Sequence, residues 1–549
     1  MLRTFGADLF TTTKSVYRVC FVPWAFLSRP WSPTSVPPTR SSMPRDVLFL
    51  ALCWACTLSS TTLLITVGPL CARNQGASDA AAPFAVGAFL VGAAVISVPS
   101  ADLFARYGRR NVFLLGCVFN LVASGLGIAA VLLHNVVLVF CATFSAGLQQ
   151  GLGQFYRFAA MEVCAPDKKP KAVTLVLTGG VIAAFVGPEV GLRTAMILGK
   201  DDEYLASFIA VGVIGVVNSF LCSLPRYPPP PPAASAALLE AEQGAAPPTP
   251  PIRLSTLMLQ PRCMLAVSVA TLAHTSMVML MSPLVIAMSN AGFPNELTTI
   301  TLETHFFSMF APGFLTGKVI AKLGPPTTSI IGIGIFGGAA AVNLLAPSYT
   351  GNAISMALWV VGMALCGLGW NLCFSSGTVM LASCYPPEAA ARVQGANDFI
   401  IFAIAGMGSF GSGYIYDLSG GNVGQGWHAL IFCVLGILGL LIGLLLVLTF
   451  ALRKPSPALP MASAFGSDRD GTSMAIEPGP PSMMDPAMLA SASHGLGRIS
   501  RDNSVLSVFS AVSGSASRVD LRRASFSSEA VFFVSVDDES ISGAVEGRD

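Results

Sequence analysis

Three polar side chains within one apolar stretch of the sequence are suited to binding a solute. Gln150, Gln154 and Arg157 follow one another at positions i, i+4 and i+7, so a helix would present all three on one face. Amides donate and accept hydrogen bonds and a guanidinium pairs with anions, so this face could line a cavity, with Arg157 nearer the cytoplasm. Hydrogen bonding between packed helices is the other use of such a face.

Two further apolar stretches carry side chains that suit an aromatic or amphipathic solute. Trp370 and Asn371 are neighbours near the middle of one stretch, where the indole offers a stacking surface and the amide offers hydrogen bonds. His274 lies near the middle of the other stretch. The alternative for Trp370 and Asn371 is ordinary packing. The alternative for His274 is a hydrogen-bonded histidine in the protein core. With the polar face above, these three residues form the predicted substrate site.

Three acids in or beside apolar stretches are candidates for coupling or gating. Burial disfavours the charged form of a carboxyl group, so Glu303 could carry a proton. Glu189 is a second such candidate, and its alternative is to reach the lipid headgroups. Asp398 is expected near the start of its stretch, where it could pair with Arg392 or Arg157 as a gate or cap the helix.

Enzyme motifs are missing from the sequence. It contains no H-E-x-x-H, no phosphate-binding G-x-x-x-x-G-K-[ST] loop and no G-x-S-x-G elbow. Cys53 and Cys56 form a C-x-x-C pair, but no His or second Cys pair accompanies them, so we interpret them as small apolar residues. We therefore expect a protein that is not an enzyme and has no catalytic residue, metal site or cofactor.

The composition places these residues in a membrane protein. Of 549 residues, 53% are hydrophobic and 11% are charged, whereas soluble globular chains carry about 25% charged residues. These charged residues are too few to cover a protein surface in water. Much of the surface must therefore face the lipid bilayer. The net charge of +2 gives no reason to expect a nucleic-acid partner.

Twelve apolar runs are long enough to cross a bilayer core of about 30 Å as helices. The first six are 46–71, 82–104, 112–133, 136–163, 172–196 and 204–224. The second six are 262–288, 298–322, 327–346, 353–383, 395–416 and 427–452. The predicted fold is all-α and integral to the membrane, with twelve transmembrane helices in two six-helix repeats.

Segments of different composition flank and separate the two sets of runs. Residues 1–45 are expected to be a cytoplasmic tail, although their basic, Ser-, Thr- and Pro-rich composition also fits a targeting segment. Residues 225–256 form a Pro-rich cytoplasmic linker between the predicted bundles 46–224 and 257–453. Residues 454–549 are too poor in apolar side chains to fold alone and are predicted to be a disordered cytoplasmic tail.

Basic residues give the predicted orientation. They gather in alternate connections, whereas the opposite connections hold few. The connections rich in basic residues contain Arg106, Arg109, Arg110, Lys168, Lys169, Lys171, Arg226, Arg253, Lys318, Lys322, Arg392, Arg453 and Lys454. Because positive charge stays on the cytoplasmic side, both termini are predicted to be cytoplasmic. The plasma membrane is favoured, and an organelle membrane is the alternative.

The two sets of runs share a local pattern. Residues 101–108 and 317–324 both read as a small residue, three further residues, Ala, a basic residue, an apolar or aromatic residue and Gly. Two six-helix repeats that enclose a site near the midplane are an architecture of transporters.

Residues 101–110 resemble the loop signature of the major facilitator superfamily, which reads Gly, three residues, Asp, Arg, any residue, Gly, Arg and a basic residue. The chain keeps Arg106, Gly108, Arg109 and Arg110. Ala105 replaces the Asp that, in the family, belongs to a charge network latching the closed state, and Asp102 could substitute for it. The resemblance implies the family's fold, with Arg106, Arg109 and Arg110 as gating candidates.

Two shorter segments resemble parts of other family signatures. Residues 150–153 are similar to a segment of proton-coupled members, but Gly147 stands where those members have Arg. Residues 187–191 are similar to half of the drug-antiporter signature, with Ala183 in place of an upstream Gly. The resemblance implies a monomeric secondary transporter of a small organic solute that works by alternating access. Proton coupling stays open, and a transport-inactive sensor or scaffold is the alternative function.

Overall fold

The computed structural model describes residues 45–164, 168–199, 202–227, 253–349, 353–385, 389–418 and 423–453. The predicted tails, apart from Arg45, and most of the predicted linker lie outside these residues. The expectations for those segments therefore stay predictions.

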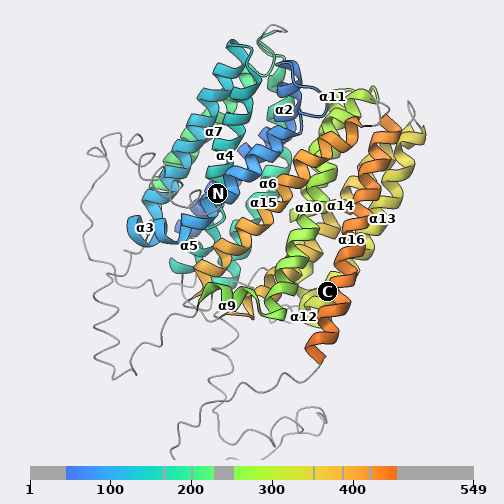
Figure 1. Ribbon diagram of the computed structural model, residues 1–549. Coiled ribbons are helices and arrows are strands. Elements are labelled where there is room, and N and C mark those ends of the chain that lie inside the picture. Colours follow the sequence, from blue (N-terminus) through green and yellow to red (C-terminus); the bar gives the residue numbers. More distant parts are fainter. Residues whose placement is uncertain are drawn as a thin grey trace, which may run out of the picture. The chain divides into compact units, whose positions relative to one another are not determined.

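The described residues form helices and contain no strand. The first half consists of α2 (Arg45–Asn74), α3 (Phe84–Leu132), α4 (Val136–Gly153), α5 (Tyr156–Glu162), α6 (Lys169–Ala195) and α7 (Leu205–Ser223). The second half consists of α9 (Leu254–Met258), α10 (Pro261–Asn290), α11 (Asn295–Phe310), α12 (Gly313–Leu323), α13 (Pro325–Leu345), η3 (Ala346–Tyr349), α14 (Ala353–Ala382), α15 (Ala390–Asp417) and α16 (Val423–Arg453). The predicted all-α membrane fold is confirmed (Figure 1).

Ten helical segments of the described chain are long and apolar enough to cross a membrane. One of them, α3, has 49 residues and consists of two helices that meet at Gly108, where the backbone is not helical. The pair α11 and α12 falls short of the length criterion because the helix is interrupted at Ala311 and Pro312. When α3 is counted as two segments and α11 with α12 as one, the arrangement matches the twelve segments expected.

Two glycines occupy matching turns in the two halves. Gly108 in α3 has φ of +75° and ψ of +165°, and Gly324 between α12 and α13 has φ of +81° and ψ of +154°. L side chains rarely adopt these angles, so glycine is the residue that fits. The two sequence segments that read alike thus make the same backbone turn, which supports the internal repeat.

Helices α3 and α4 pack through glycine. A Cβ atom on Gly147 would collide with the carbonyl oxygen of Phe89, and one on Gly92 would collide with the carbonyl oxygen of Phe144. Small residues at such positions let the two backbones approach closely. The resulting van der Waals contacts stabilise helix association in lipid, where the hydrophobic effect does not drive helices together. At these two positions α3 and α4 therefore meet backbone to backbone.

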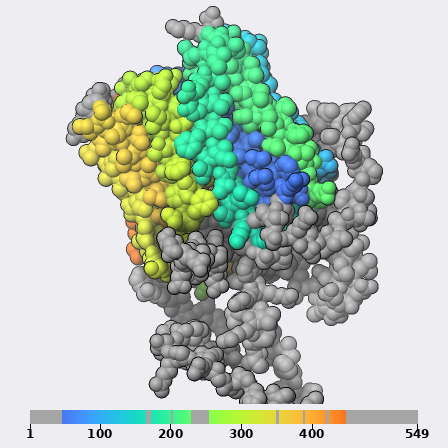
Figure 2. Space-filling model, turned by 180° about the vertical axis from the view of Figure 1, so that it is seen from behind, coloured from blue at the N-terminus to red at the C-terminus, as the bar shows by residue number. Residues whose placement is uncertain are grey.

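The two halves touch along three helix pairs. These pairs are α3 with α15, α6 with α11, and α2 with α10. Figure 2 shows α6, in teal, beside the yellow-green α11.

The connections gather at opposite ends of the bundle. We call the end with the turn at Gly108 and the end of α5 the Arg109 end, and the end with residues 75–83 and 291–294 the Asp79 end. The basic connections expected on the cytoplasmic side fall at the Arg109 end.

Candidate functional site

A cavity of about 400 Å³ lies between the two halves. Side chains from α2, α3, α4, α5 and α6 line it on one side, and side chains from α10, α11, α12, α14 and α15 line it on the other. All six residues predicted to bind substrate line this one cavity, namely Gln150, Gln154, Arg157, His274, Trp370 and Asn371. Their role in binding stays a prediction, but the structure brings them together.

The second half supplies an aromatic wall. The rings of Trp370 and Phe374 stack with centroids 4.7 Å apart and planes 20° apart. His274 packs beside them, 5.9 Å from the Trp370 ring and 5.8 Å from the Phe402 ring. Phe310 meets Trp370 edge to face at 6.4 Å. These ring faces and edges can bind a flat aromatic ring, because aromatic pairs favour offset-stacked and edge contacts.

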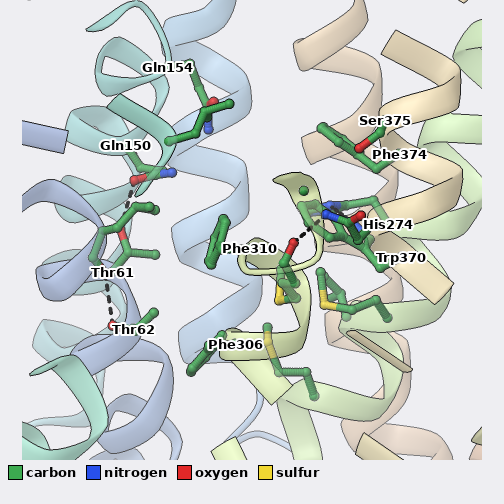
Figure 3. A pocket seen from close by; sticks show the side chains of 18 of the residues that line it. Thr61, Thr62, Gln150, Gln154, His274, Phe306, Phe310, Trp370, Phe374 and Ser375 are labelled. Carbon is green, nitrogen blue, oxygen red and sulfur yellow. Dashed lines mark hydrogen bonds between the residues drawn. The ribbon is translucent and has the colours of Figure 1, made fainter. Parts of the chain in front are cut away.

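The first half supplies a polar wall. Gln150 is buried, and its Oε1 accepts a hydrogen bond from the Thr61 hydroxyl at 2.9 Å. The Gln150 Nε2 donors make no hydrogen bond among the described residues and are not sealed from the cavity. Figure 3 shows Gln150 and Gln154 on one side of the cavity and His274 and Trp370 on the other.

The predicted polar face is not a continuous helix. Helix α4 ends at Gly153, Gln154 and Phe155 form a turn, and α5 begins at Tyr156. The expected i, i+4, i+7 stripe is therefore broken before Arg157. The guanidinium of Arg157 still reaches the cavity lining and lies 4.8 Å from the ring centre of Phe158.

Asn371 lines the cavity but uses its amide inside the protein. Its Nδ2 donates to the Met309 carbonyl at 2.8 Å, and its Oδ1 accepts from the Thr316 hydroxyl. These two contacts hold the end of α11 and the start of α12 on either side of the interruption at Pro312. A support for the broken helix is thus the better description of Asn371 than the direct solute contact predicted from its position.

Sequence comparison identifies the kind of protein that has this cavity. The sequence profile of the Major Facilitator Superfamily matches residues 50–409. The chain belongs to the major facilitator superfamily.

Superfamily members among curated proteins resemble most of the chain. The riboflavin transporter RfnT of Brucella anthropi is 27% identical over 399 residues, which cover 72% of this chain and 94% of that protein. The uncharacterised transporter YddS of Bacillus subtilis, of the same superfamily, is 25% identical over 397 residues, covering 70% of this chain and 85% of that protein. Membership in this superfamily of transporters supports membrane transport as the general function.

Solved structures of superfamily members share the fold. A D-xylose–proton symporter aligns with a TM-score of 0.56 at 14% identity, over 75% of this chain and 98% of that one. A bacterial homologue of the human lysosomal transporter Spinster, inward-facing and unoccupied, aligns with a TM-score of 0.58 at 14% identity, over 77% and 100%. At this identity the likeness shows the fold alone.

The gating candidates of the superfamily signature lie at the Arg109 end, outside the cavity lining. Arg109 donates from Nε to Glu162 at 3.1 Å, in a two-pronged ion pair, and its guanidinium lies 4.8 Å from the ring centre of Phe104. This ion pair joins the end of α5 to the turn at Gly108. Arg106 is exposed and Arg110 half-exposed.

The three acids occupy different environments. Glu189 is partly exposed and pairs with Arg193 one helical turn away. Glu303 is half-buried on α11, and its Oε1 is buried without a hydrogen-bond partner among the described residues. Asp398 is buried within α15, which begins at Ala390. The interpretation of Asp398 as a helix cap is therefore wrong, because the helix begins earlier than its hydrophobicity suggests.

Sequence reasoning missed several lining residues. Lys318 on α12 places a second cation on the lining, opposite the half that carries Arg157. Thr61 and Thr62 on α2 add hydroxyl groups. A threonine hydroxyl in a membrane helix usually donates a hydrogen bond to a carbonyl of its own helix. Only the hydrogen bond to Gln150 therefore distinguishes Thr61 from other threonines as a lining residue. Among the described residues, no group of three His, Cys, Asp or Glu side chains is arranged to hold a metal ion.

Proposed function

We propose that the chain carries a planar heteroaromatic solute of the riboflavin kind across a membrane by alternating access. The stacked pair of Trp370 and Phe374, facing Gln150 across the cavity, carries this proposal. A fused heterocycle has two flat faces for the aromatic wall and polar edges for the amides. The riboflavin transporter among the relatives supports the same class of solute.

Contacts between the two halves at the Asp79 end fit alternating access. At the Asp79 end, Asn290 of the second half donates to Asp79 of the first, and the Ser409 hydroxyl donates to the Pro83 carbonyl at 3.0 Å. Towards the Arg109 end, the lining continues to Arg157 and Lys318. A solute would then enter or leave at the Arg109 end in this arrangement and at the Asp79 end in the opposite one.

Proton coupling is proposed to use Glu303. This residue lies on α11, which packs against α6 of the other half, and its charge environment includes Glu189 and Arg193 of α6. A carboxyl oxygen that is buried without a partner is costly when charged, so a proton is a fitting ligand for it. Because the contact between α6 and α11 joins the halves, the proton load could differ between the two states.

Uptake of labelled riboflavin into vesicles containing the purified protein tests the proposal. Uptake above that of empty vesicles is expected, and Trp370→Leu should reduce it about tenfold by removing the stacking face. Trp359→Leu is the matched control, since it removes another buried indole from α14 that does not line the cavity. Absence of riboflavin binding and flux would refute the solute class, whereas binding without flux would favour a sensor or scaffold.

A further inference from the structure

One hydrogen bond on the aromatic wall determines the chemical state of a cavity residue. The indole Nε1 of Trp370 lies 2.9 Å from Nδ1 of His274. An indole N–H can only donate, so Nδ1 of His274 must accept. An imidazole that accepts at Nδ1 is neutral and carries its proton on Nε2.

The protonated nitrogen has no hydrogen-bond partner in the part of the chain that the structure describes. No hydrogen bond joins Nε2 of His274 to another described residue, and Nε2 is not among the sealed polar atoms. By contrast, Nε2 of His305 is sealed and unbonded, and that residue does not line the cavity. The rings of Trp370, Phe374 and Phe402 pack around His274, and its Nε2–H is a polar group that this wall offers to the cavity, beside the Ser375 hydroxyl.

We infer that Trp370 fixes His274 as a hydrogen-bond donor that selects solutes with an acceptor atom at the ring edge. Trp370 would then act twice, by stacking on the solute and by positioning the proton on its neighbour. With the amide donors of Gln150 on the opposite wall, the cavity would grip a flat heterocycle from both edges by donation. The inference rests on the proposed function and adds the polarity that the solute must have.

The state of His274 can be measured without any solute. Nitrogen-15 NMR of histidine-labelled protein distinguishes a bare Nδ1 with a protonated Nε2 from the other tautomer and from imidazolium. The His274 signal is assigned by its loss in His274→Gln. We expect the Nε2–H form in the unmodified protein and a mixture in Trp370→Phe, which keeps an aromatic ring but removes the donor. Finding the Nδ1–H form or imidazolium in the unmodified protein would overturn the inference.

Binding then tests the selection of an acceptor. Riboflavin is compared with 1-deazariboflavin and 5-deazariboflavin, in each of which a C–H group replaces one ring acceptor. We expect the unmodified protein to bind one deaza compound about tenfold more weakly than riboflavin. His274→Phe and Trp370→Phe should lose this discrimination, His274→Gln should keep part of it, and the controls His305→Gln and Trp359→Phe should keep it all.

The outcomes separate the two proposals. If riboflavin does not bind the unmodified protein, the proposed solute class fails, and the tautomer measurement alone decides whether Trp370 fixes His274. If riboflavin binds but discrimination is equal in the unmodified protein and in His274→Phe, the selective role of His274 is refuted while the proposed function stands.

Discussion

Asn290 donates a hydrogen bond to Asp79, with Nδ2 and Oδ2 2.7 Å apart, and this contact joins the two halves at the Asp79 end. Arg73 holds the other carboxylate oxygen of Asp79 at 3.1 Å. Asn290 also lies 3.5 Å from the Tyr416 hydroxyl. One carboxylate therefore links a cation of the first half to an amide of the second.

Removing this carboxylate should favour opening of the Asp79 end. Asp79→Ala loses the hydrogen bond from Asn290 that joins the halves, worth about 1 kcal/mol, or about fivefold in the ratio of closed to open molecules. Hydrogen–deuterium exchange should rise in peptides covering residues 76–83 and 290–294. The control Asp417→Ala removes an exposed acid from the end of α15 and should leave exchange in these peptides unchanged. Equal exchange in both variants would exclude the contact as a latch.

The break between α11 and α12 should depend on Asn371. Asn371→Leu leaves the Met309 carbonyl and the Thr316 hydroxyl without this partner, which should cost about 2 kcal/mol of stability. Thr316→Val removes one of the two contacts and should cost less. Thermal unfolding of the detergent-purified variants measures the order. A larger loss in Thr316→Val than in Asn371→Leu would contradict the supporting role of the amide.

Arg157 should matter for flux more than for folding. Arg157→Ala is expected to lower flux about tenfold or more while the protein still inserts and folds, and Arg157→Lys should rescue poorly because a lysine lacks the planar fork. Asp398 remains the predicted carboxylate partner in at least one state. Arg262→Ala, which removes an exposed cation of α10 outside the cavity lining, should retain flux. Normal flux in Arg157→Ala would remove it from the proposed site.

Gly147 should tolerate no side chain. In Gly147→Ala the new methyl group meets the Phe89 carbonyl, so α3 and α4 must move apart at a cost of about 1–3 kcal/mol. Gly125→Ala is the matched control, because its methyl group would have no atom within 4 Å. Melting temperatures of the two variants provide the comparison, and similar values would show that the helices adjust freely.

Glu303 should couple flux to a pH gradient. Glu303→Gln cannot release a proton, so the gradient should no longer accelerate uptake, whereas exchange of labelled for unlabelled solute should continue. Glu296→Gln removes an exposed acid from the first turn of the same helix and serves as the control. Gradient-driven uptake that survives in Glu303→Gln would assign coupling to another group or to none.

Hydrophobicity along the chain was enough to predict the fold, because a membrane helix needs a long apolar run whatever its neighbours are. The same contrast located the lining residues: Gln150, His274 and Trp370 are polar or amphipathic in runs that are otherwise apolar. Spacing along one helix cannot show what lies across from it. The partner of Glu162, the lock of Trp370 on His274 and the use of Asn371 on α12 all join segments far apart in sequence.

Local breaks were also beyond prediction. Gly151 and Gly153 precede the turn at Gln154 and Phe155 and weaken the helix there, but glycines are so frequent in these helices that they do not single out this position. Ala390 begins α15 before the apolar run starts, and this places Asp398 inside the helix rather than at its cap. Both features arise from packing between helices, which one chain read in order does not reveal.

Because the two walls of the cavity belong to different halves, a bound molecule that contacts both walls also sets the distance between the halves. A cargo must be short enough for the halves to close around it on either side of the cycle. A longer molecule with the same ring and the same polar edges would hold the halves at one spacing and arrest them. The length of the molecule, rather than its affinity, would then distinguish a transported solute from an inhibitor.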